Sequence, residues 1–269
     1  KEERSSPMQV LVLLVSFFAC TVGAICGIGG GIIIKPVLDA TGVADVATIN
    51  FLSGCTVLSM TLYSVLKAKL SGTSTIDPKT DTPLAIGAAV GGLAGKELFS
   101  IVAGLFPDPN TAGAVQAGLL LLITLGTLVY TIYKEKIPTL NVTSTVACLA
   151  IGFALGVCSS FLGIGGGPIN LVVLFYFFTM ATKRAASSSL YIILFSQATS
   201  TASSIVTGGY VGVDLMLLAA MVVCGILGGI VGRKVNSKID DKTVDKLFMG
   251  LMVLIILINA YNIWKFALA

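Results

Sequence analysis

The chain has 269 residues, of which 55% are hydrophobic and only 11% are charged, and its net charge is +4. Soluble domains carry about 25% charged residues, so this composition indicates a polytopic membrane protein. Histidine is absent, which excludes histidine metal sites, histidine-dependent catalytic triads and histidine proton relays. The positive net charge requires no nucleic-acid partner, because the cytoplasmic loops of membrane proteins are rich in Lys and Arg.

Apolar runs of the length that crosses a bilayer, about 20 residues, follow one another along the chain. We predict spanning helices over residues 8–28, 46–66, 78–95, 112–133, 143–162, 185–207, 214–232 and 244–264. Two shorter apolar segments, 30–38 and 167–180, each follow a run of glycines. The expected fold is therefore all-α, a polytopic transmembrane helix bundle that forms a single domain over residues 1–269.

The cysteines all lie inside apolar runs and none forms a CxxC pair: Cys20, Cys26, Cys55, Cys148, Cys158 and Cys224. We expect free thiols that pack as small hydrophobic side chains, rather than disulfides or metal ligands. No constellation of a nucleophile and a base accompanies them. We therefore expect no enzyme, no cofactor and no metal site.

The two halves of the chain match each other. The pentapeptide Gly-Ile-Gly-Gly-Gly occurs at 27–31 and again at 163–167, each time at the end of a long apolar run. Further residues recur at nearly the same separation: Ser53 as Ser189, Ser64 as Ser200, Gly72 as Gly208, Asp77 as Asp214, and the run 91–96 as 228–233. We predict an internal duplication, a common plan in transporters, with repeat one over residues 8–133 and repeat two over 143–266. Both aspartates precede a predicted helix, where N-caps are expected.

Positive charge tests the orientation of the two repeats, because Lys and Arg concentrate in cytoplasmic loops. Eight plain crossings divide the 17 basic residues almost equally between the two sides. If the glycine-interrupted segments 8–40 and 143–180 each enter and leave on one side, the second repeat is inverted, and only Lys1, Arg4, Lys35, Lys96 and Lys265 lie outside. We therefore predict inverted repeats, an external N-terminus, and cytoplasmic loops near 67–82, 134–142, 181–184 and 233–246. The alternative is an ordinary eight-helix bundle with parallel repeats.

The glycine blocks are the predicted substrate site. Runs of glycine let the backbone leave the helical path, and the partial positive charge at a helix N-terminus favours an anion. Broken helices near the bilayer midplane are where transporters bind substrate. The predicted ligands are Gly27, Gly29, Gly30, Gly31, Gly163, Gly165, Gly166 and Gly167. The alternative is close helix packing, because both blocks also contain the GxxxG pattern.

Polar side chains extend this predicted site. Asn50, Ser53, Ser189, Ser196 and Gln197 lie on the helices that follow the two blocks, and we expect them to donate hydrogen bonds to the anion. The alternative is that such hydroxyls bond to their own backbone or join helices. Lys35 either neutralises the anion or reaches the outer surface beside Asp39. Lys183 and Arg184 could attract anions to a cytoplasmic entrance, although orientation signals explain them equally well.

A second set of glycines has a different prediction. Gly91, Gly92, Gly95, Gly228, Gly229 and Gly232 lie inside continuous apolar spans. Small residues at helical spacing let membrane helices approach closely. We therefore interpret these glycines as packing faces rather than as ligands.

The paired blocks resemble the TauE/SafE family of membrane proteins. The first copy reads GIGGGIIIKPVL at 27–38, and the second reads GIGGGPINLVVL at 163–174 with the proline that the family often carries after the glycines. The resemblance implies a transporter, often described as an exporter of sulfite or organosulfonates, with residues 27–31 and 163–167 at the core of its transport site. The family is usually drawn with about eight crossings, from which the inverted arrangement departs.

We therefore expect a secondary transporter of a small anion, sulfite or an organosulfonate, that works by alternating access. Its partners are the anion, the lipid bilayer and a coupling ion, H⁺ or Na⁺, and no nucleic acid. One alternative is a channel-like facilitator for the same anions. The other is a membrane scaffold subunit that transports nothing. The identity of the anion, the direction of transport and the oligomeric state stay open.

Overall fold

The structure is a computed structural model that describes residues 5–107, 109–209 and 211–268. The described residues form ten α-helices, one short 3-10 helix and no strand, which confirms the predicted all-α fold. In chain order the elements are α1 (Ser5–Cys26), α2 (Gly31–Thr41), α3 (Val46–Leu70), α4 (Asp81–Gly104), α5 (Pro109–Tyr133), η1 (Lys134–Lys136), α6 (Thr145–Phe161), α7 (Pro168–Phe178), α8 (Thr182–Val206), α9 (Leu215–Asn236) and α10 (Asp241–Leu268).

Among the described helices, six are long and apolar enough to cross a membrane: α1, α3, α4, α5, α9 and α10. Helix α6 has 17 residues and α7 has 11, so both are shorter than a typical span. Helix α8 has 25 residues, but it is rich in Ser and Thr and is not among the apolar six. The chain is an integral, multi-pass membrane protein.

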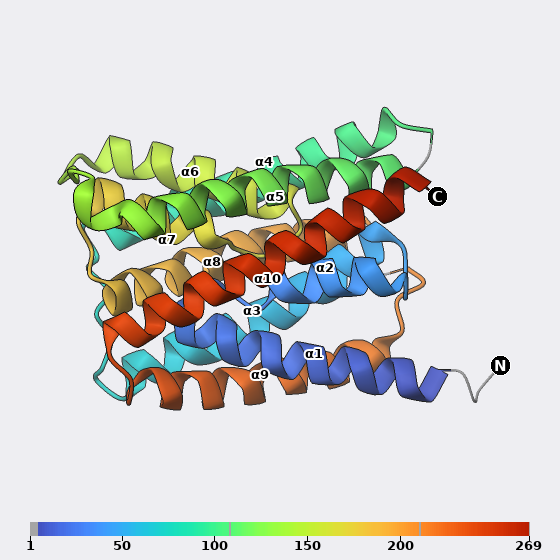
Figure 1. The fold of residues 1–269 in the computed structure, drawn as a ribbon, viewed down its shortest axis with the longest axis horizontal. Helices are drawn as coiled ribbons and strands as arrows, with labels where there is room; N and C mark the ends of the chain where they lie inside the picture. Colours follow the sequence, from blue (N-terminus) through green and yellow to red (C-terminus); the bar gives the residue numbers. More distant parts are fainter. Residues whose placement is uncertain (1–4, 108, 210, 269) are drawn as a thin grey trace.

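Helices α2 and α7 both turn back toward the end of the molecule where the preceding helix began. The N–H of Leu140, which lies just before α6, bonds to the carbonyl of Tyr176 near the end of α7 at 2.7 Å. Lys265 near the end of α10 bonds to the carbonyls of Asp39 and Ala40 near the end of α2. The start of α1 and the end of α10 lie at the same end of the molecule (Figure 1). We call this the terminal end.

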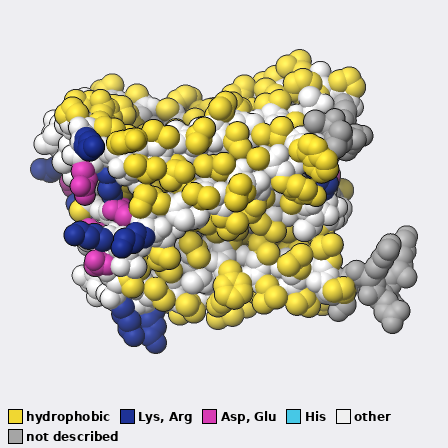
Figure 2. Space-filling model, in the orientation of Figure 1, with side chains coloured by type: hydrophobic (Ala, Val, Ile, Leu, Met, Phe, Trp, Pro, Cys, Tyr) yellow, Lys and Arg dark blue, Asp and Glu magenta, His cyan; other side chains and the backbone are white. Residues whose placement is uncertain are grey.

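Basic side chains gather at the opposite end, where the loops 71–80, 137–144, 179–181 and 237–240 lie, and we call this the basic end (Figures 1 and 2). Hydrophobic side chains cover the lateral face between the two ends (Figure 2). Helices α3 and α8, which occupy matching positions in the two halves of the sequence, run in opposite directions (Figure 1).

Glycines pack helix α4 against α6 and helix α9 against α1. A Cβ added to Gly91 would lie 2.1 Å from the carbonyl oxygen of Phe153, and one added to Gly232 would lie 2.2 Å from that of Thr21. Gly95 approaches the carbonyl of Val157 in the same way. These contacts confirm the interpretation of this second set of glycines as packing faces. The larger hydrophobic cluster lies beside these helix contacts. Its buried members include Leu84, Ala88, Ile164, Leu171 and Ile192.

Two local predictions differ in outcome. Asp214 caps α9, because its side chain accepts hydrogen bonds from the N–H groups of Met216 and Leu217. The matching prediction for Asp77 is wrong, since α4 begins at Asp81. The carboxylate of Asp81 accepts the N–H of Asp77 at 2.7 Å and closes the chain between them into a turn.

The six cysteines are free, as predicted.

Candidate functional site: two glycine segments and a basic vestibule

The helical path stops at each glycine block. Helix α1 ends at Cys26 and α2 begins at Gly31, and between them Gly27 and Gly29 have φ angles of +77° and +74°. Helix α6 ends at Phe161 and α7 begins at Pro168, with positive φ at Gly163, Gly165 and Gly166. Only glycine adopts such angles without a steric cost. The glycines therefore make these reversals possible. We call residues 27–31 the first glycine segment and 163–167 the second.

The two glycine segments lie in direct contact, although 136 residues separate them in the sequence. A Cβ added to Gly31 would lie 1.9 Å from the carbonyl oxygen of Ile164, and one added to Gly166 would lie 3.3 Å from that of Ile28. Two fully buried aliphatic side chains at matching positions, Val57 of α3 and Ile193 of α8, pack against both segments. The space between the segments is therefore filled by packing in this structure.

Several backbone N–H groups of both segments have no hydrogen-bond acceptor among the described residues. In the first segment these are the amides of Gly29, Gly30 and Gly31, followed by that of Ile32 in α2, and in the second those of Gly165, Gly166 and Gly167, followed by that of Ile169 in α7. An unpaired amide away from water costs several kcal/mol. These donors lie at the N-termini of α2 and α7, and helix N-termini favour anions.

Four of the five predicted polar side chains lie beside these segments or the helices that follow them. Asn50 lies against Gly163, and Ser53 lies 2.9 Å from the position of a Cβ on Gly31; an oxygen of each side chain is buried without a partner. Gln197 contacts Gly165. Ser189 accepts a hydrogen bond from Asn170 of α7 at 3.4 Å.

Ser196 bonds to the backbone of its own helix, which is the alternative that the sequence left open for these hydroxyls. Its hydroxyl donates to the carbonyl of Ile193 in its own helix at 3.2 Å. Asn170 was not predicted as a site residue, yet it is fully buried in the first turn of α7 with one oxygen unpartnered. Its only sequence signal is an amide side chain in an otherwise apolar segment.

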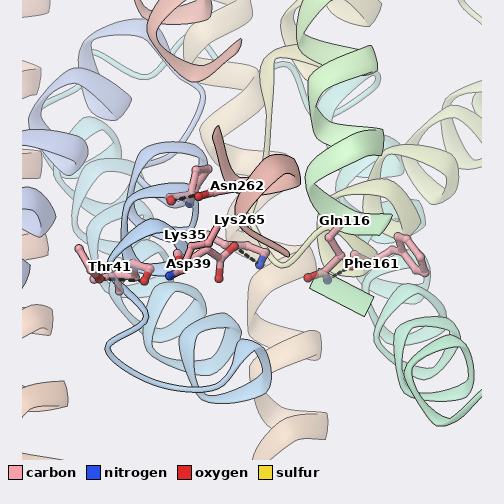
Figure 3. A network of polar contacts seen from close by, with 9 residues as sticks. Lys35, Asp39, Thr41, Gln116, Phe161, Asn262 and Lys265 are labelled. Atoms are coloured by element: carbon pink, nitrogen blue, oxygen red, sulfur yellow. Dashed lines mark hydrogen bonds and ion pairs between the residues drawn. The ribbon is translucent and has the colours of Figure 1, made fainter. Parts of the chain in front are cut away.

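Lys35 lies in a buried ion pair. Its ammonium group bonds to the carboxylate of Asp39 at 2.7 Å, and its side chain is 2% exposed. Figure 3 shows this pair on α2 close to Lys265 and Asn262 of α10. Asn262 donates to the carbonyl of Pro36 at 2.8 Å. Lys35 thus lies beside Asp39, but it does not reach the surface, and its charge is already paired.

A cavity of about 600 Å³ leads from the basic end toward the first glycine segment, and we call it the basic vestibule. Its lining includes five basic side chains and no carboxylate: Lys67, Lys183, Arg184, Arg233 and Lys234. Ala186 belongs to the same lining, and its Cα lies 2.2 Å from where a Cβ on Gly27 would be. The vestibule therefore ends at the first glycine segment.

The positive charge of the vestibule is largely unneutralised. Within the described residues, Arg184 is the only lining cation in an ion pair, with Asp81 at 3.3 Å. Arg233 bonds instead to neutral acceptors, the carbonyl of Ser64 at 2.8 Å and the hydroxyls of Ser71 and Thr73. These bonds fix the guanidinium group without cancelling its charge. The sequence left Lys183 and Arg184 open between an anion entrance and orientation signals, and it gave Arg233 only as a cytoplasmic charge that sets orientation.

A second, small cavity of about 30 Å³ lies on the terminal side of the second glycine segment. Its lining includes Asn50, Gly163 and Gln197, together with Lys96 of α4. No group of three or more His, Cys, Asp or Glu side chains is placed to hold a metal ion in the part of the chain that the structure describes. Lys96 and the side-chain amides of Asn50 and Gln197 bring hydrogen-bond donors to this cavity.

Comparison with known proteins agrees with this geometry. The family model described as "Sulfite exporter TauE/SafE" matches residues 12–258 of the chain. Neither the curated proteins nor the solved structures contain a match. The matched range covers both glycine segments, all of α2 to α9 and most of α1 and α10, so the chain belongs to the TauE/SafE sulfite exporter family, a family of membrane transporters.

Proposed function

We propose that this protein is a secondary transporter that carries a small anion, sulfite or an organosulfonate, across the bilayer. One observation carries the proposal. A vestibule with five basic side chains and no carboxylate in its lining ends at a glycine segment in which the amides of Gly29, Gly30 and Gly31 have no acceptor among the described residues. Both parts favour a negatively charged ligand.

In this proposal the basic vestibule attracts the anion and the glycine segments bind it. A cleft lined by one sign of charge raises the local concentration of the opposite ion, so Lys67, Lys183 and Arg233 draw anions toward the first segment. The anion then replaces its water with amide donors of Gly29, Gly30 and Gly31, as expected at a helix N-terminus. The hydroxyl of Ser53, which has no partner, adds a donor, and Asn50 can donate through its amide nitrogen.

The two repeats, 8–133 and 143–266, are inverted with respect to each other in this proposal. The opposite directions of α3 and α8 and the return of α2 and α7 support it (Figure 1). The N-terminus then lies outside and the basic end faces the cytoplasm, since Lys and Arg mark the cytoplasmic side. An H⁺ or Na⁺ coupling ion completes the transport cycle.

The packing between the segments favours a carrier over a channel-like facilitator. The segments touch through Gly31 and Ile164, and Val57 and Ile193 fill the space beside them. No continuous route of water passes such a contact. The anion can cross only if these groups move while the vestibule closes, which is the alternating access of repeat-based transporters.

Uptake into proteoliposomes tests the proposal. Labelled sulfite and a panel of organosulfonates are presented to the wild-type protein, to Arg233→Gln, and to Lys242→Gln as the control. Lys242 is exposed and does not line the vestibule. We expect saturable uptake that Arg233→Gln weakens at least several-fold through a higher KM and that Lys242→Gln leaves unchanged. Equal uptake by wild-type liposomes and empty liposomes across the panel would contradict transport of these anions.

A further inference from the structure

The small cavity on the terminal side is lined largely by residues at repeat positions equivalent to those that line the basic vestibule. Eight of its ten lining residues match vestibule residues at a separation of 136 or 137 positions. The matching pairs are Ser160 with Ala24, Ala47 with Lys183, Asn50 with Ala186, Phe51 with Ser187, Ser200 with Ser64, Ser204 with Ala68, Lys96 with Arg233, and Phe99 with Asn236. The same separation relates the two glycine segments.

The two cavities lie on opposite sides of the glycine segments. The basic vestibule uses the last part of α3, the first part of α8, and helices α1 and α9. The small cavity uses the first part of α3, the last part of α8, and helices α4 and α6. Its contact with the site is Gly163, whose counterpart Gly27 lies against Ala186 at the inner limit of the vestibule.

The chemistry of the small cavity also suits an anion. Lys96 is half-buried and forms no ion pair with a described carboxylate, and it stands where Arg233 stands in the vestibule. The side chains of Ser160 and Gln197 are more than nine-tenths buried in the lining, and the hydroxyl of Ser160 has no partner. Its volume of about 30 Å³ holds roughly two or three waters, since a water needs about 10–15 Å³ of such space.

We propose that this cavity is the closed form of a second anion vestibule, in which Lys96 is the cation that receives the anion on the terminal side. The inference rests on the proposed function and deepens it. The described structure is then the state that is open to the basic end alone. When the repeats exchange conformations, this cavity opens while the basic vestibule contracts.

Close packing of α4 holds the second vestibule shut. The backbone of α4 meets α6 and α8 through glycines, with a Cβ on Gly95 only 2.4 Å from the carbonyl of Val157 and one on Gly92 only 2.5 Å from that of Ser196. Phe99 lines the cavity and packs edge-on against Phe161 of α6 at 6.2 Å between ring centres. Opening must separate these two rings. The equivalent position of Phe99 in the open vestibule is the polar Asn236.

Cysteine accessibility tests the proposal. In a background whose six native cysteines are replaced by Ala, single Ser204→Cys and Ala68→Cys variants are exposed to an anionic, membrane-impermeant methanethiosulfonate from one face at a time. We expect Ala68→Cys to react only from the basic end and Ser204→Cys only from the terminal end, at a slower rate. If Ser204→Cys reacts from neither face, or from the basic end, in a variant that still transports methanesulfonate, the second vestibule is wrong and the proposed function stands.

A measurement of KM in the protein with its native cysteines gives a second test that does not depend on replacing them. In sealed vesicles of each orientation, we expect Lys96→Gln to raise the KM for methanesulfonate at least threefold from the terminal side, and Lys96→Arg to restore it. Arg233→Gln should do the same from the basic side. An unchanged KM from the terminal side in Lys96→Gln would overturn the role of Lys96, whereas absence of transport in the wild type would overturn the proposed function instead.

Discussion

The side-chain amide of Asn236 donates a 2.6 Å hydrogen bond to the carbonyl oxygen of Ile25, two residues before the first glycine segment. This carbonyl belongs to the last turn of α1, where no further helical N–H is available to it. Gln116 of α5 donates in the same way to Phe161, the carbonyl at the matching position of α6, also at 2.6 Å. The two helix ends that precede the glycine segments are thus held by amide side chains from different helices.

Removal of these amide donors lowers stability. Asn236→Ala and Gln116→Ala each leave a helix-end carbonyl without a partner, which costs about 1–3 kcal/mol when the group is buried. We expect both variants to unfold at lower temperature in detergent. Lys238→Ala, an exposed neighbour in the chain, is the control and should match the wild type. If Asn236→Ala unfolds at the same temperature as the wild type, this hydrogen bond contributes nothing to stability.

Lys35→Met separates a structural role of this lysine from a role in anion binding. The variant leaves the carboxylate of Asp39 buried and unpaired, and breaking a buried pair in this way costs about 3–5 kcal/mol. We expect a large loss of stability in chemical denaturation and an unchanged KM in the fraction that stays folded. Lys35→Met combined with Asp39→Leu should recover much of the stability. A stable single variant with a strongly raised KM would instead make Lys35 an anion ligand.

Gly31→Ala tests the contact between the two segments. Gly31 needs no positive φ, so the new methyl group acts through its contacts, chiefly the clash with the carbonyl of Ile164, 1.9 Å away, and also that with the hydroxyl of Ser53, 2.9 Å away. We expect transport to fall at least tenfold because the segments are forced apart. Gly118→Ala is the matched control, since a Cβ there meets nothing within 4 Å and alanine favours a helix by roughly 0.5–1 kcal/mol. Wild-type transport by Gly31→Ala would contradict the close approach of the segments.

Arg233→Lys measures what the neutral acceptors around this arginine contribute. Lysine keeps the charge but cannot reproduce the planar fork of donors that now reaches Ser64, Ser71 and Thr73. The expected order of KM values is wild type lowest, Arg233→Lys intermediate and Arg233→Gln highest, measured from the basic side at low ionic strength. Equal KM values for Arg233→Lys and Arg233→Gln would mean that a positive charge at this position does not by itself improve anion binding.

The sequence predicted the features that depend on local backbone chemistry. Positive φ at Gly27, Gly29, Gly163 and Gly165 is a property of glycine itself, so the ends of α1 and α6 could be predicted closely. Helix length and apolarity likewise gave the six long apolar helices. Helix α8 was harder to interpret, because its Ser and Thr residues serve both a helix contact and a cavity wall.

The features that the sequence missed depend on partners far along the chain. Asn236 and Gln116 act on helix ends 211 and 45 residues away, and no local pattern reveals such a pairing. Asp77 is followed by a proline and looks like a cap, but Asp81 takes the N–H of Asp77 and the helix starts later. The sequence left Lys35 open between an anion ligand and a surface position beside Asp39, and the structure buries the pair on α2 close to α10 (Figure 3).

Counterflow in proteoliposomes shows whether one anion site faces the two sides of the membrane in turn. Liposomes that contain the wild-type protein are loaded with unlabelled methanesulfonate, and entry of the labelled anion is followed. We expect internal methanesulfonate to accelerate entry and the rate to saturate with external concentration, because one site between the glycine segments faces the two sides in turn. Entry that rises linearly with concentration and ignores the internal anion would contradict this expectation.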